Sequence, residues 1–456
     1  MIKQIKLNRL IKSIAGITTL SLIGFLIYLN LVGCITIPNQ HKGFPPGVWR
    51  GVIYIYEYKN LIVTEGRKEV ISRDVDYESK SKFIPFNFEI HYDSLKKPIM
   101  IVMNGSERIV FDDISIGRDI RNGDDTFRIN LLPYDACLKG VFEEDKMRGY
   151  FIVQDKKDYF MPFEAKYGQD HRFNKTNQRT ADTVNGTYQA IFADTSVSDR
   201  FNAIGEFSQV KNRVTGTFRT ETGDFRYLEG EVDGNKLLLS CFDGSHAFLF
   251  EADIKGDSLI GMYYSGKHYK TNWQAVKVNS GQLEDANTIT TLKDKNQNFK
   301  FKFYTPEQKL IDLDAPEYKN KVKVIQIMGS WCPNCRDESA FLNEYLKEHS
   351  NPDLVVIGLS FERYPDKQKA YERIKKYKTS LNLNYEIAYG GMSKKDSAAA
   401  ALPQLSGINA YPTMMFVDRN NKVTKIHTGF DGPATSQFQK FKSEFDKTIQ
   451  DLLIQK

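Results

Sequence analysis

The sequence predicts a multidomain protein in which a β-rich, antiparallel N-terminal region is followed by an α/β domain. The chain has 456 residues, a length that suggests about three domains. From residue 47 to about 280, segments of alternating polarity are separated by turn pairs such as Asn104-Gly105 and Asp243-Gly244. From Phe299 onward, short apolar runs alternate with amphipathic helical segments, as expected for a βαβ sheet.

The first 34 residues predict a targeting segment, because a basic, acid-free stretch precedes an apolar run from Ile14 to Val32. The run ends in Leu31-Val32-Gly33-Cys34, which resembles a bacterial lipoprotein box, so we expect Cys34 to be lipidated as the first mature residue. An uncleaved anchor helix is the alternative, because the run is close to spanning length. Either interpretation predicts a protein anchored to a membrane of the bacterial cell envelope and facing the periplasm.

The formal net charge of +6 is concentrated in this leader, whose basic residues are Lys3, Lys6, Arg9 and Lys12. The rest of the chain carries only +2. A nearly neutral body gives no electrostatic basis for binding nucleic acid, so we expect no nucleic-acid partner.

A tether at 35–46 leads into the β-rich region, which we expect to form two domains, at 47–170 and 183–278. The reason is an internal echo: Gly47–Gly51 is similar to Asn185–Tyr188, and Asp135–Tyr150 parallels Asp243–Tyr263. A single sandwich or barrel is the alternative. The clearest predicted strands are Val52–Tyr58, Phe83–His91, Phe127–Leu132 and Arg148–Val153.

No catalytic constellation is predicted in the β-rich region. Asp243, Ser245 and His246 are the residue types of a hydrolase triad, but they lie in one D-G-S-H turn, whereas triad members come from distant positions. Cys137 and Cys241 either pair with each other or are buried free thiols, since connectivity cannot be read from sequence.

The C-terminal domain is expected at 299–456, after a polar linker at 279–298. Its continuous apolar run at Leu354–Ser360 is typical of a central parallel strand, and the last two strands suit an antiparallel hairpin at the sheet edge. The other expected strands are Phe299–Tyr304, Val322–Met328, Met414–Val417 and Val423–His427, and the expected helices are Asp337–His349, Asp366–Leu381 and Pro433–Ile454.

A Cys-x-x-Cys pair, Cys332 and Cys335, lies between the expected strand Val322–Met328 and the following helix. One helical turn brings both sulfurs to the same helix end, and Pro333 suits a first helical position. Unpaired backbone amides and the helix dipole there favour the Cys332 thiolate, the form that attacks disulfides. A zinc site would need a second Cys or His pair, which the sequence lacks, so we expect no metal. A purely structural disulfide is the other alternative.

Two motifs carry a resemblance to a known family: Trp331-Cys332-Pro333-Asn334-Cys335, and Ala410-Tyr411-Pro412-Thr413 running into Met414–Asp418. With them, residues 299–456 resemble the thioredoxin-fold domain of the TlpA/ResA-like thiol–disulfide oxidoreductases of bacterial envelopes. The β-rich region more distantly resembles the N-terminal parts of some Bacteroidetes members.

The resemblance implies roles for several residues. Pro412 is cis and packs beside the dithiol, and Trp331, Tyr411 and Thr413 join it in binding substrate, with the Tyr411 backbone facing an extended chain. Glu338 is the active-site acid, and a surface helix acid is its alternative. This chain departs from thioredoxins proper at Gln326, where they have a buried acid, and in its Pro-Asn dipeptide.

The function expected from these motifs is extracytoplasmic reduction of protein disulfides, with Cys332 as nucleophile and Cys335 as resolving thiol. The dithiol is the redox group, and no further cofactor is expected. Expected partners are disulfide-bonded envelope proteins, with apocytochrome c as a candidate in cytochrome c biogenesis, and a membrane thiol electron donor. The alternatives are a thiol peroxidase, which needs a P-x-x-x-[ST]-x-x-C setting that Trp331 fits poorly, and a non-enzymatic binding protein that uses its β-rich region.

Overall fold

The computed structural model describes residues 43–55, 82–121, 123–174, 183–193 and 200–455. The predicted leader, its Cys34 and residues 35–42 of the tether lie outside the described residues. Within the described part of the chain, no helix has both the length and the apolar character needed to span a membrane.

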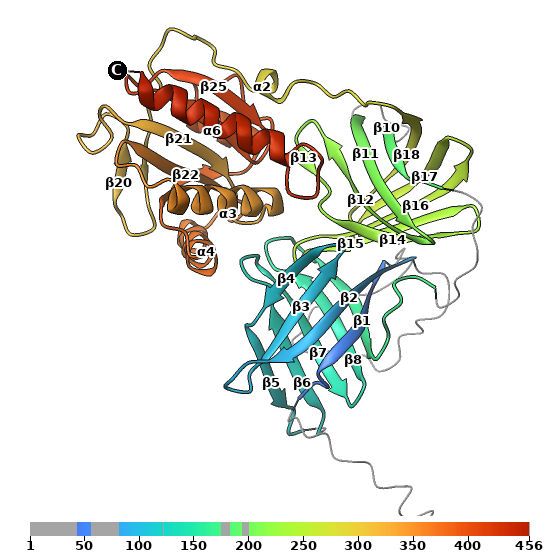
Figure 1. Cartoon of the computed structure of the whole chain (residues 1–456). Coiled ribbons are helices and arrows are strands. Elements are labelled where there is room, and N and C mark those ends of the chain that lie inside the picture. The colour runs from blue at the N-terminus through green and yellow to red at the C-terminus, as the bar shows by residue number, and fades with distance from the viewer. Residues whose placement is uncertain (1–42, 56–81, 122, 175–182, 194–199, 456) are drawn as a thin grey trace, which may run out of the picture. The chain divides into compact units, whose positions relative to one another are not determined.

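The first β-rich region is one nine-stranded sheet in the order β4-β3-β2-β1-β9-β8-β7-β6-β5 (Figure 1). Every neighbouring pair is antiparallel. Burial alternates along most strands, and Trp49, Phe86 and Phe88 are fully buried on the inner face. The strands are β1 (Gly47–Ile55), β2 (Lys82–Tyr92), β3 (Pro98–Asn104), β4 (Glu107–Phe111), β5 (Ile114–Arg118), β6 (Asp125–Asn130), β7 (Ala136–Glu143), β8 (Lys146–Val153) and β9 (Phe160–Tyr167).

The second β-rich region is another antiparallel sheet, in the order β11-β10-β18-β17-β16-β15-β14-β12-β13. An additional pairing of β11 with β12 closes this sheet on itself. Its interior is filled by aromatic rings, such as Phe218 and Trp273, whose centroids lie 5.1 Å apart. The strands are β10 (Gly186–Phe192), β11 (Phe201–Val210), β12 (Arg213–Thr220), β13 (Gly223–Asp224), β14 (Leu228–Asp233), β15 (Lys236–Phe242), β16 (Ala247–Lys255), β17 (Ser258–Ser265) and β18 (Tyr269–Val278).

The two sheets share a strand order at the positions where the sequence echoes itself. Gly47 and Gly186 open β1 and β10 with φ values of 121° and 125°. Each of these strands pairs with the next strand and with the last strand of its sheet. The second echo falls on β7–β8 and β16–β17, which occupy matching places. This correspondence supports the duplication, which stays a prediction.

Cys137 in β7 and Cys241 in β15 are both buried and unpaired, so the free-thiol alternative describes them. Burial raises the pKa of each thiol.

The C-terminal domain is built on a five-stranded sheet in the order β23-β22-β21-β24-β25. β21 and β22 are parallel, β22 and β23 are parallel, and β24 and β25 form the antiparallel edge hairpin that the sequence predicted. The predicted architecture, an antiparallel region followed by an α/β domain, is confirmed. The elements are α2 (Ala286–Ile289), β19 (Lys302–Tyr304), β20 (Leu310–Asp312), β21 (Val322–Met328), α3 (Pro333–Glu348), β22 (Leu354–Glu362), α4 (Lys367–Ser380), β23 (Glu386–Met392), α5 (Lys395–Ala401), β24 (Thr413–Val417), β25 (Val423–Thr428) and α6 (Phe438–Ile454).

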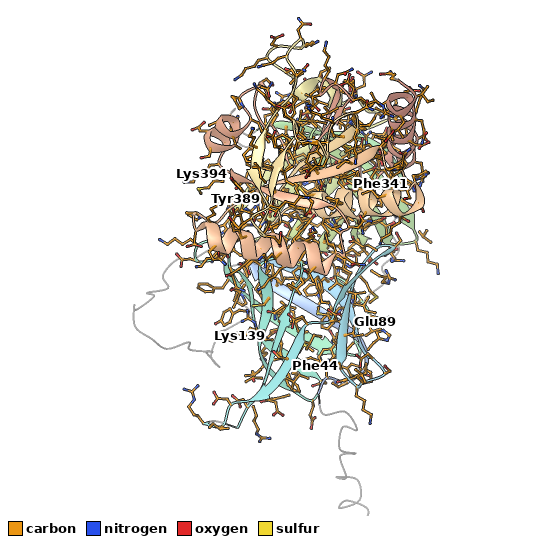
Figure 2. The ribbon with its side chains drawn as sticks, turned by 90° about the vertical axis from the view of Figure 1, so that its left-hand side faces the viewer. Phe44, Glu89, Lys139, Phe341, Tyr389 and Lys394 are labelled. Carbon is orange, nitrogen blue, oxygen red and sulfur yellow. A yellow bond between two sulfur atoms is a disulfide. The ribbon has the colours of Figure 1, made fainter. Side chains whose placement is uncertain are left out.

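Both faces of this sheet are covered, as the fully buried strand β21 requires. Figure 1 shows α6 crossing one face near α3, and Phe341 of α3 (labelled in Figure 2) contacts Phe445 of α6 with ring centroids 5.0 Å apart. Ile374 and Tyr377 of α4 belong to the same cluster. The opposite face packs against the β19–β20 hairpin and α5.

Several element boundaries differ from the predicted ones, including that of β1, which begins at Gly47 rather than Val52. α3 begins at Pro333 rather than Asp337, because Cys332 caps it and Pro333 occupies its first position. α6 begins at Phe438 rather than Pro433, and the strand predicted from Phe299 begins only at Lys302. β22 runs two residues past Ser360, to Glu362.

Four elements of the C-terminal part of the chain were missed: α2, β20, β23 and α5. β20 has only three residues. β23 contains Gly390-Gly391, which weakens a strand pattern. α5 is rich in alanine and has no apolar stripe, and the four-residue α2 lies in the predicted linker.

Candidate active site

The two motif cysteines lie at the N-terminal end of α3 and are joined by a disulfide, with Cα atoms 5.2 Å apart. Cys332 is the N-cap residue, and its sulfur accepts a hydrogen bond from the Cys335 backbone N–H at 3.1 Å. Cys335 is completely buried, whereas Cys332 keeps 5% of its surface exposed. Cys332 is therefore the sulfur nearer to solvent, and the helix end stabilises its thiolate.

The loop that precedes β24 lies beside this sulfur. The Tyr411-Pro412 peptide bond is cis, as the resemblance implied. The Tyr411 carbonyl oxygen lies 3.4 Å from the Cys332 sulfur. Thr413 is buried, and its hydroxyl donates to the Ala410 carbonyl at 2.9 Å. The fold thus brings together two motifs that are about 80 residues apart in sequence, as βαβ folds do with loops at the ends of neighbouring strands.

Trp331 forms one wall beside the disulfide. Its indole N–H donates to the Phe361 carbonyl at 2.9 Å, which fixes the ring. The ring meets Tyr411 edge-on at 5.4 Å, and the Arg363 guanidinium lies 4.0 Å from its centroid. Trp331 and Tyr411 are both partly buried, so an aromatic surface remains next to Cys332.

Glu338 lies in the core one turn after Cys335, so the surface-acid alternative is wrong. Gln326 donates to one carboxyl oxygen at 2.9 Å, and the other oxygen has no hydrogen-bond partner. Burial raises the pKa of Glu338 to about 8. Gln326 is itself held by the hydroxyls of Ser339 and Tyr385, both at 3.0 Å. A buried carboxyl group with a raised pKa therefore lies one helical turn after Cys335.

A second buried acid, Glu362, was missed by the sequence analysis. It accepts hydrogen bonds from the Ser330 N–H at 3.1 Å, the Ser330 hydroxyl at 2.7 Å and the Ser360 hydroxyl at 2.5 Å. Burial raises the pKa of Glu362. The hydrogen bonds from Ser330 to Glu362 fix the loop that leads into Trp331 and Cys332. The sequence signal that could have identified Glu362 is its position as an acid at the end of a continuous apolar run.

Replacing Glu362 by alanine is expected to lower the free energy of unfolding by about 2–4 kcal/mol, because buried donors of Ser330 and Ser360 lose their acceptor. Denaturant unfolding of the oxidised protein measures this. Glu348→Ala, at the exposed end of α3, is the matched control and should change stability by less than about 0.5 kcal/mol. Equal stabilities of the two variants would contradict the anchoring role.

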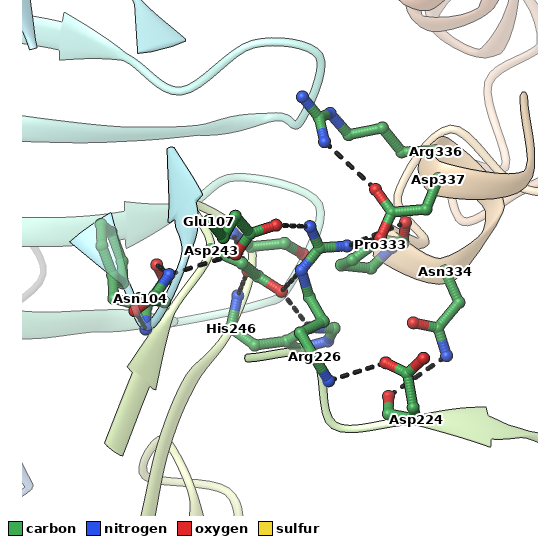
Figure 3. Close-up of polar contacts among 12 residues, drawn as sticks. Asn104, Glu107, Asp224, Arg226, Asp243, His246, Pro333, Asn334, Arg336 and Asp337 are labelled. Carbon is green, nitrogen blue, oxygen red and sulfur yellow. Dashed lines mark hydrogen bonds and ion pairs between the residues drawn. The ribbon is translucent and has the colours of Figure 1, made fainter. Parts of the chain in front are cut away.

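Residues of the second β-rich region also contact the active-site loop (Figure 3). The Ser245 hydroxyl donates to the Trp331 carbonyl at 3.3 Å. Arg226 donates to the Pro333 carbonyl at 3.4 Å, and the Asn334 side chain donates to the Asp224 carbonyl at 3.3 Å. None of these contacts was predicted, because they join positions 86 to 110 residues apart.

The D-G-S-H turn is a turn and not a triad. One carboxyl oxygen of Asp243 accepts the backbone N–H groups of Ser245 and His246, at 2.8 and 2.6 Å. The His246 ring lies 3.3 Å from the other Asp243 oxygen, while the Ser245 hydroxyl points to Trp331. This is the local Asx chemistry that the sequence analysis favoured.

Part of the chain is similar to known proteins. Residues 291–442 match the Redoxin family. The relative named thiol-disulfide oxidoreductase ResA, from Geobacillus thermodenitrificans, is 23% identical over 129 residues, which cover 27% of this chain and 67% of that protein.

Solved structures are also similar to about a third of the chain. One is a thiol:disulfide interchange protein of the thioredoxin family from Chlorobium tepidum, with 17% identity, TM-score 0.27, and coverage of 36% of this chain and 99% of that one. Another is a thiol-disulfide oxidoreductase from Bacteroides fragilis, with 18% identity, TM-score 0.25, and coverage of 32% and 99%.

Proposed function

We propose that the chain is a thiol–disulfide oxidoreductase of the TlpA/ResA-like type, which reduces protein disulfides outside the cytoplasm through Cys332 and Cys335. The match of residues 291–442 to the Redoxin family and the similarity to ResA support this proposal. The observation that carries the proposal is the disulfide at the start of α3, in which Cys332 is 5% exposed and Cys335 is completely buried, with the buried carboxyl group of Glu338 one helical turn after Cys335. The redox group is the dithiol, and no other cofactor takes part.

In the proposed reaction the Cys332 thiolate attacks a substrate disulfide. The substrate S–S bond breaks, a mixed disulfide forms, and the leaving sulfur takes up a proton. Cys335 then loses its proton and attacks the Cys332 sulfur, which releases the second substrate thiol and forms the Cys332–Cys335 disulfide. Two electrons pass from the dithiol to the substrate. The ionised form of Glu338, a minor fraction at neutral pH because the pKa is about 8, is suited to accept the Cys335 proton from one helical turn away.

The substrate chain is proposed to bind along the Tyr411-Pro412-Thr413 loop. The Tyr411 carbonyl, 3.4 Å from the Cys332 sulfur, is a backbone acceptor beside the reacting atom. An extended peptide can pair with such a group while its cystine lies over Cys332. Trp331 supplies an apolar wall for the side chains that flank the cystine.

The location and the partners extend the proposal. The leader and Cys34 support a membrane-anchored protein that faces the periplasm. The cycle then requires a membrane thiol electron donor to reduce the Cys332–Cys335 disulfide again. Disulfide-bonded envelope proteins are the proposed substrates, and apocytochrome c is a candidate among them.

The Cys335→Ala variant tests the proposal in cells, because it forms the mixed disulfide but cannot resolve it. We expect disulfide-linked complexes at Cys332, which disappear on reduction and are identified by mass spectrometry. The matched control is the Cys332→Ala/Cys335→Ala double variant, which should trap nothing.

Other outcomes of this experiment would favour different functions. Peroxide consumption that persists in Cys335→Ala would favour the thiol peroxidase. Absence of any trapped protein, together with unchanged growth of cells that carry the double variant, would favour a binding function of the β-rich region.

A further inference from the structure

Three contacts from the second β-rich region flank the nucleophilic cysteine on both sides. Ser245 bonds the carbonyl of Trp331, which precedes Cys332, and Arg226 bonds the carbonyl of Pro333, which follows it. Asn334, the next residue, bonds the Asp224 carbonyl. The dipeptide between the two cysteines is thus held by the segment Asp224–Arg226, as Figure 3 shows.

Arg226 is a fully buried cation that joins separate parts of the fold. Its side chain is 3% exposed, and it donates to Glu107 of β4 and to Asp337 of α3. A third carboxylate, Asp243, lies 3.9 Å from its Nε. Burying an arginine is costly unless acids surround it. Moving α3 away would remove Asp337 from the buried Arg226, so this ion pair stabilises the position of α3.

The backbone of this segment is shaped for the contact. Arg226 has φ of +57°, in the left-handed region that side chains disfavour, and its N–H donates to the Asp224 carboxylate at 2.7 Å. Gly223 has φ of +144°, and a Cβ there would lie 2.2 Å from the Asn334 amide nitrogen. The other Asp224 oxygen accepts the Gly432 N–H at 2.8 Å. Backbone strain that persists beside a reacting group is characteristic of functional sites.

The charges near this helix end act on the Cys332 sulfur. Asp337 is a negative charge close to the N-terminal end of α3, where it opposes a thiolate, and Arg226 neutralises it. Without Arg226, the carboxylates of Asp337, Glu107 and Asp243 would face the helix end with less compensation. The charged and titratable groups near this end of α3 are Glu107, Tyr134, Asp224, Arg226, Asp243, His246, Arg336 and Asp337.

We propose that the second β-rich region completes the active site, with Arg226, Asp224 and Ser245 as positioning residues that hold the Trp331–Asn334 loop and allow the helix end to stabilise the Cys332 thiolate. The proposal rests on the oxidoreductase function and gives the β-rich region a part in it. It assigns Arg226 an electrostatic effect on Cys332 that a merely structural arginine would lack.

The test measures alkylation of Cys332 by iodoacetamide in the reduced full chain at pH 6.5, with modification at Cys332 followed by mass spectrometry. The rate reports the thiolate fraction and needs no substrate. In Arg226→Met we expect a rate about 10-fold lower, equivalent to a pKa of the Cys332 thiol about one unit higher. In Asp337→Asn, which leaves the cation and removes the opposing charge, we expect a rate at least about 3-fold higher.

Arg213→Met is the matched control, because Arg213 is an exposed arginine of the same sheet that pairs with Glu229. Its rate should equal that of the unmodified chain. A folded Arg226→Met protein with the unmodified rate would overturn the proposal. If Arg226→Met does not fold, the proposal is tested with Asp337→Asn alone. An alkylation rate of Cys332 in Asp337→Asn equal to that of the unmodified chain would then overturn the proposal. Failure of the unmodified chain to reduce any protein disulfide would refute the proposed function, and these rates would still be measured.

Discussion

Cys332→Ser is expected to lower the rate of reduction of a model protein disulfide, such as that of insulin, by roughly 10³-fold or more, to the rate of buffer with reductant. The reason is that Cys332 is the motif sulfur with surface exposure and the N-cap residue of α3, whereas Cys335 is completely buried. A serine hydroxyl at that position neither ionises near neutral pH nor forms a mixed disulfide. Turbidity of insulin with the full chain measures the rate.

The matched control for this experiment is Cys137→Ser, since Cys137 is a buried free thiol in the first sheet. That variant should keep the rate of the unmodified chain, provided that its unfolding transition shows it to be folded. Substantial reduction by Cys332→Ser would instead identify another sulfur as the nucleophile, and the assignment of the two motif cysteines would then be wrong.

Glu338→Gln is expected to change how stability depends on pH. The unfolded carboxyl titrates near pH 4.5, whereas burial raises the pKa of the folded one to about 8. Between these values the folded state keeps a proton that the unfolded state has lost. Stability from this group is therefore complete below pH 4.5 and is lost as the pH rises through 8. Within that window the free energy of unfolding should fall by about 1.4 kcal/mol per pH unit because of Glu338.

Glutamine has nearly the same shape and no charge, so in Glu338→Gln this component of the slope disappears. The variant should be the more stable protein above pH 8, by denaturant unfolding of the oxidised forms. Resolution of the mixed disulfide should slow by about 10²-fold, because the proton acceptor is gone. Glu348→Gln, at the exposed end of α3, is the control. Identical pH slopes for Glu338→Gln and the unmodified chain would show that Glu338 is ionised in the fold.

The local parts of the site could be predicted from the sequence. Val322–Met328 is a strand with the predicted bounds, because it is a short, mainly apolar run. The cysteine pair followed from the spacing of its motif. The cis Pro412 and the selection of Glu338 as a candidate acid followed from the family resemblance, which did not give the burial of Glu338. Hairpins in the β-rich region were marked by turn pairs such as Asn104-Gly105.

The missing parts depend on contacts that have no local signature. Arg226 and Ser245 reach the site from loops between strands of another sheet, and their neighbours in sequence do not indicate a contact with the cysteine motif. Glu362 was missed because a charged residue at the end of an apolar run normally marks the return to solvent, whereas here two serines supply its donors in the interior. α5 was missed because its alanines give helix propensity without an amphipathic pattern.

The burial of Cys137 and Cys241 in separate sheets limits unwanted disulfide exchange with Cys332. Each thiol is enclosed in a different β-sheet, and burial raises the pKa of both, so neither presents a thiolate to a mixed disulfide at Cys332. Intramolecular scrambling would require one of the sheets to open. Among the described residues, neither remaining thiol is therefore placed to divert the proposed cycle of Cys332 and Cys335 into a dead-end crosslink.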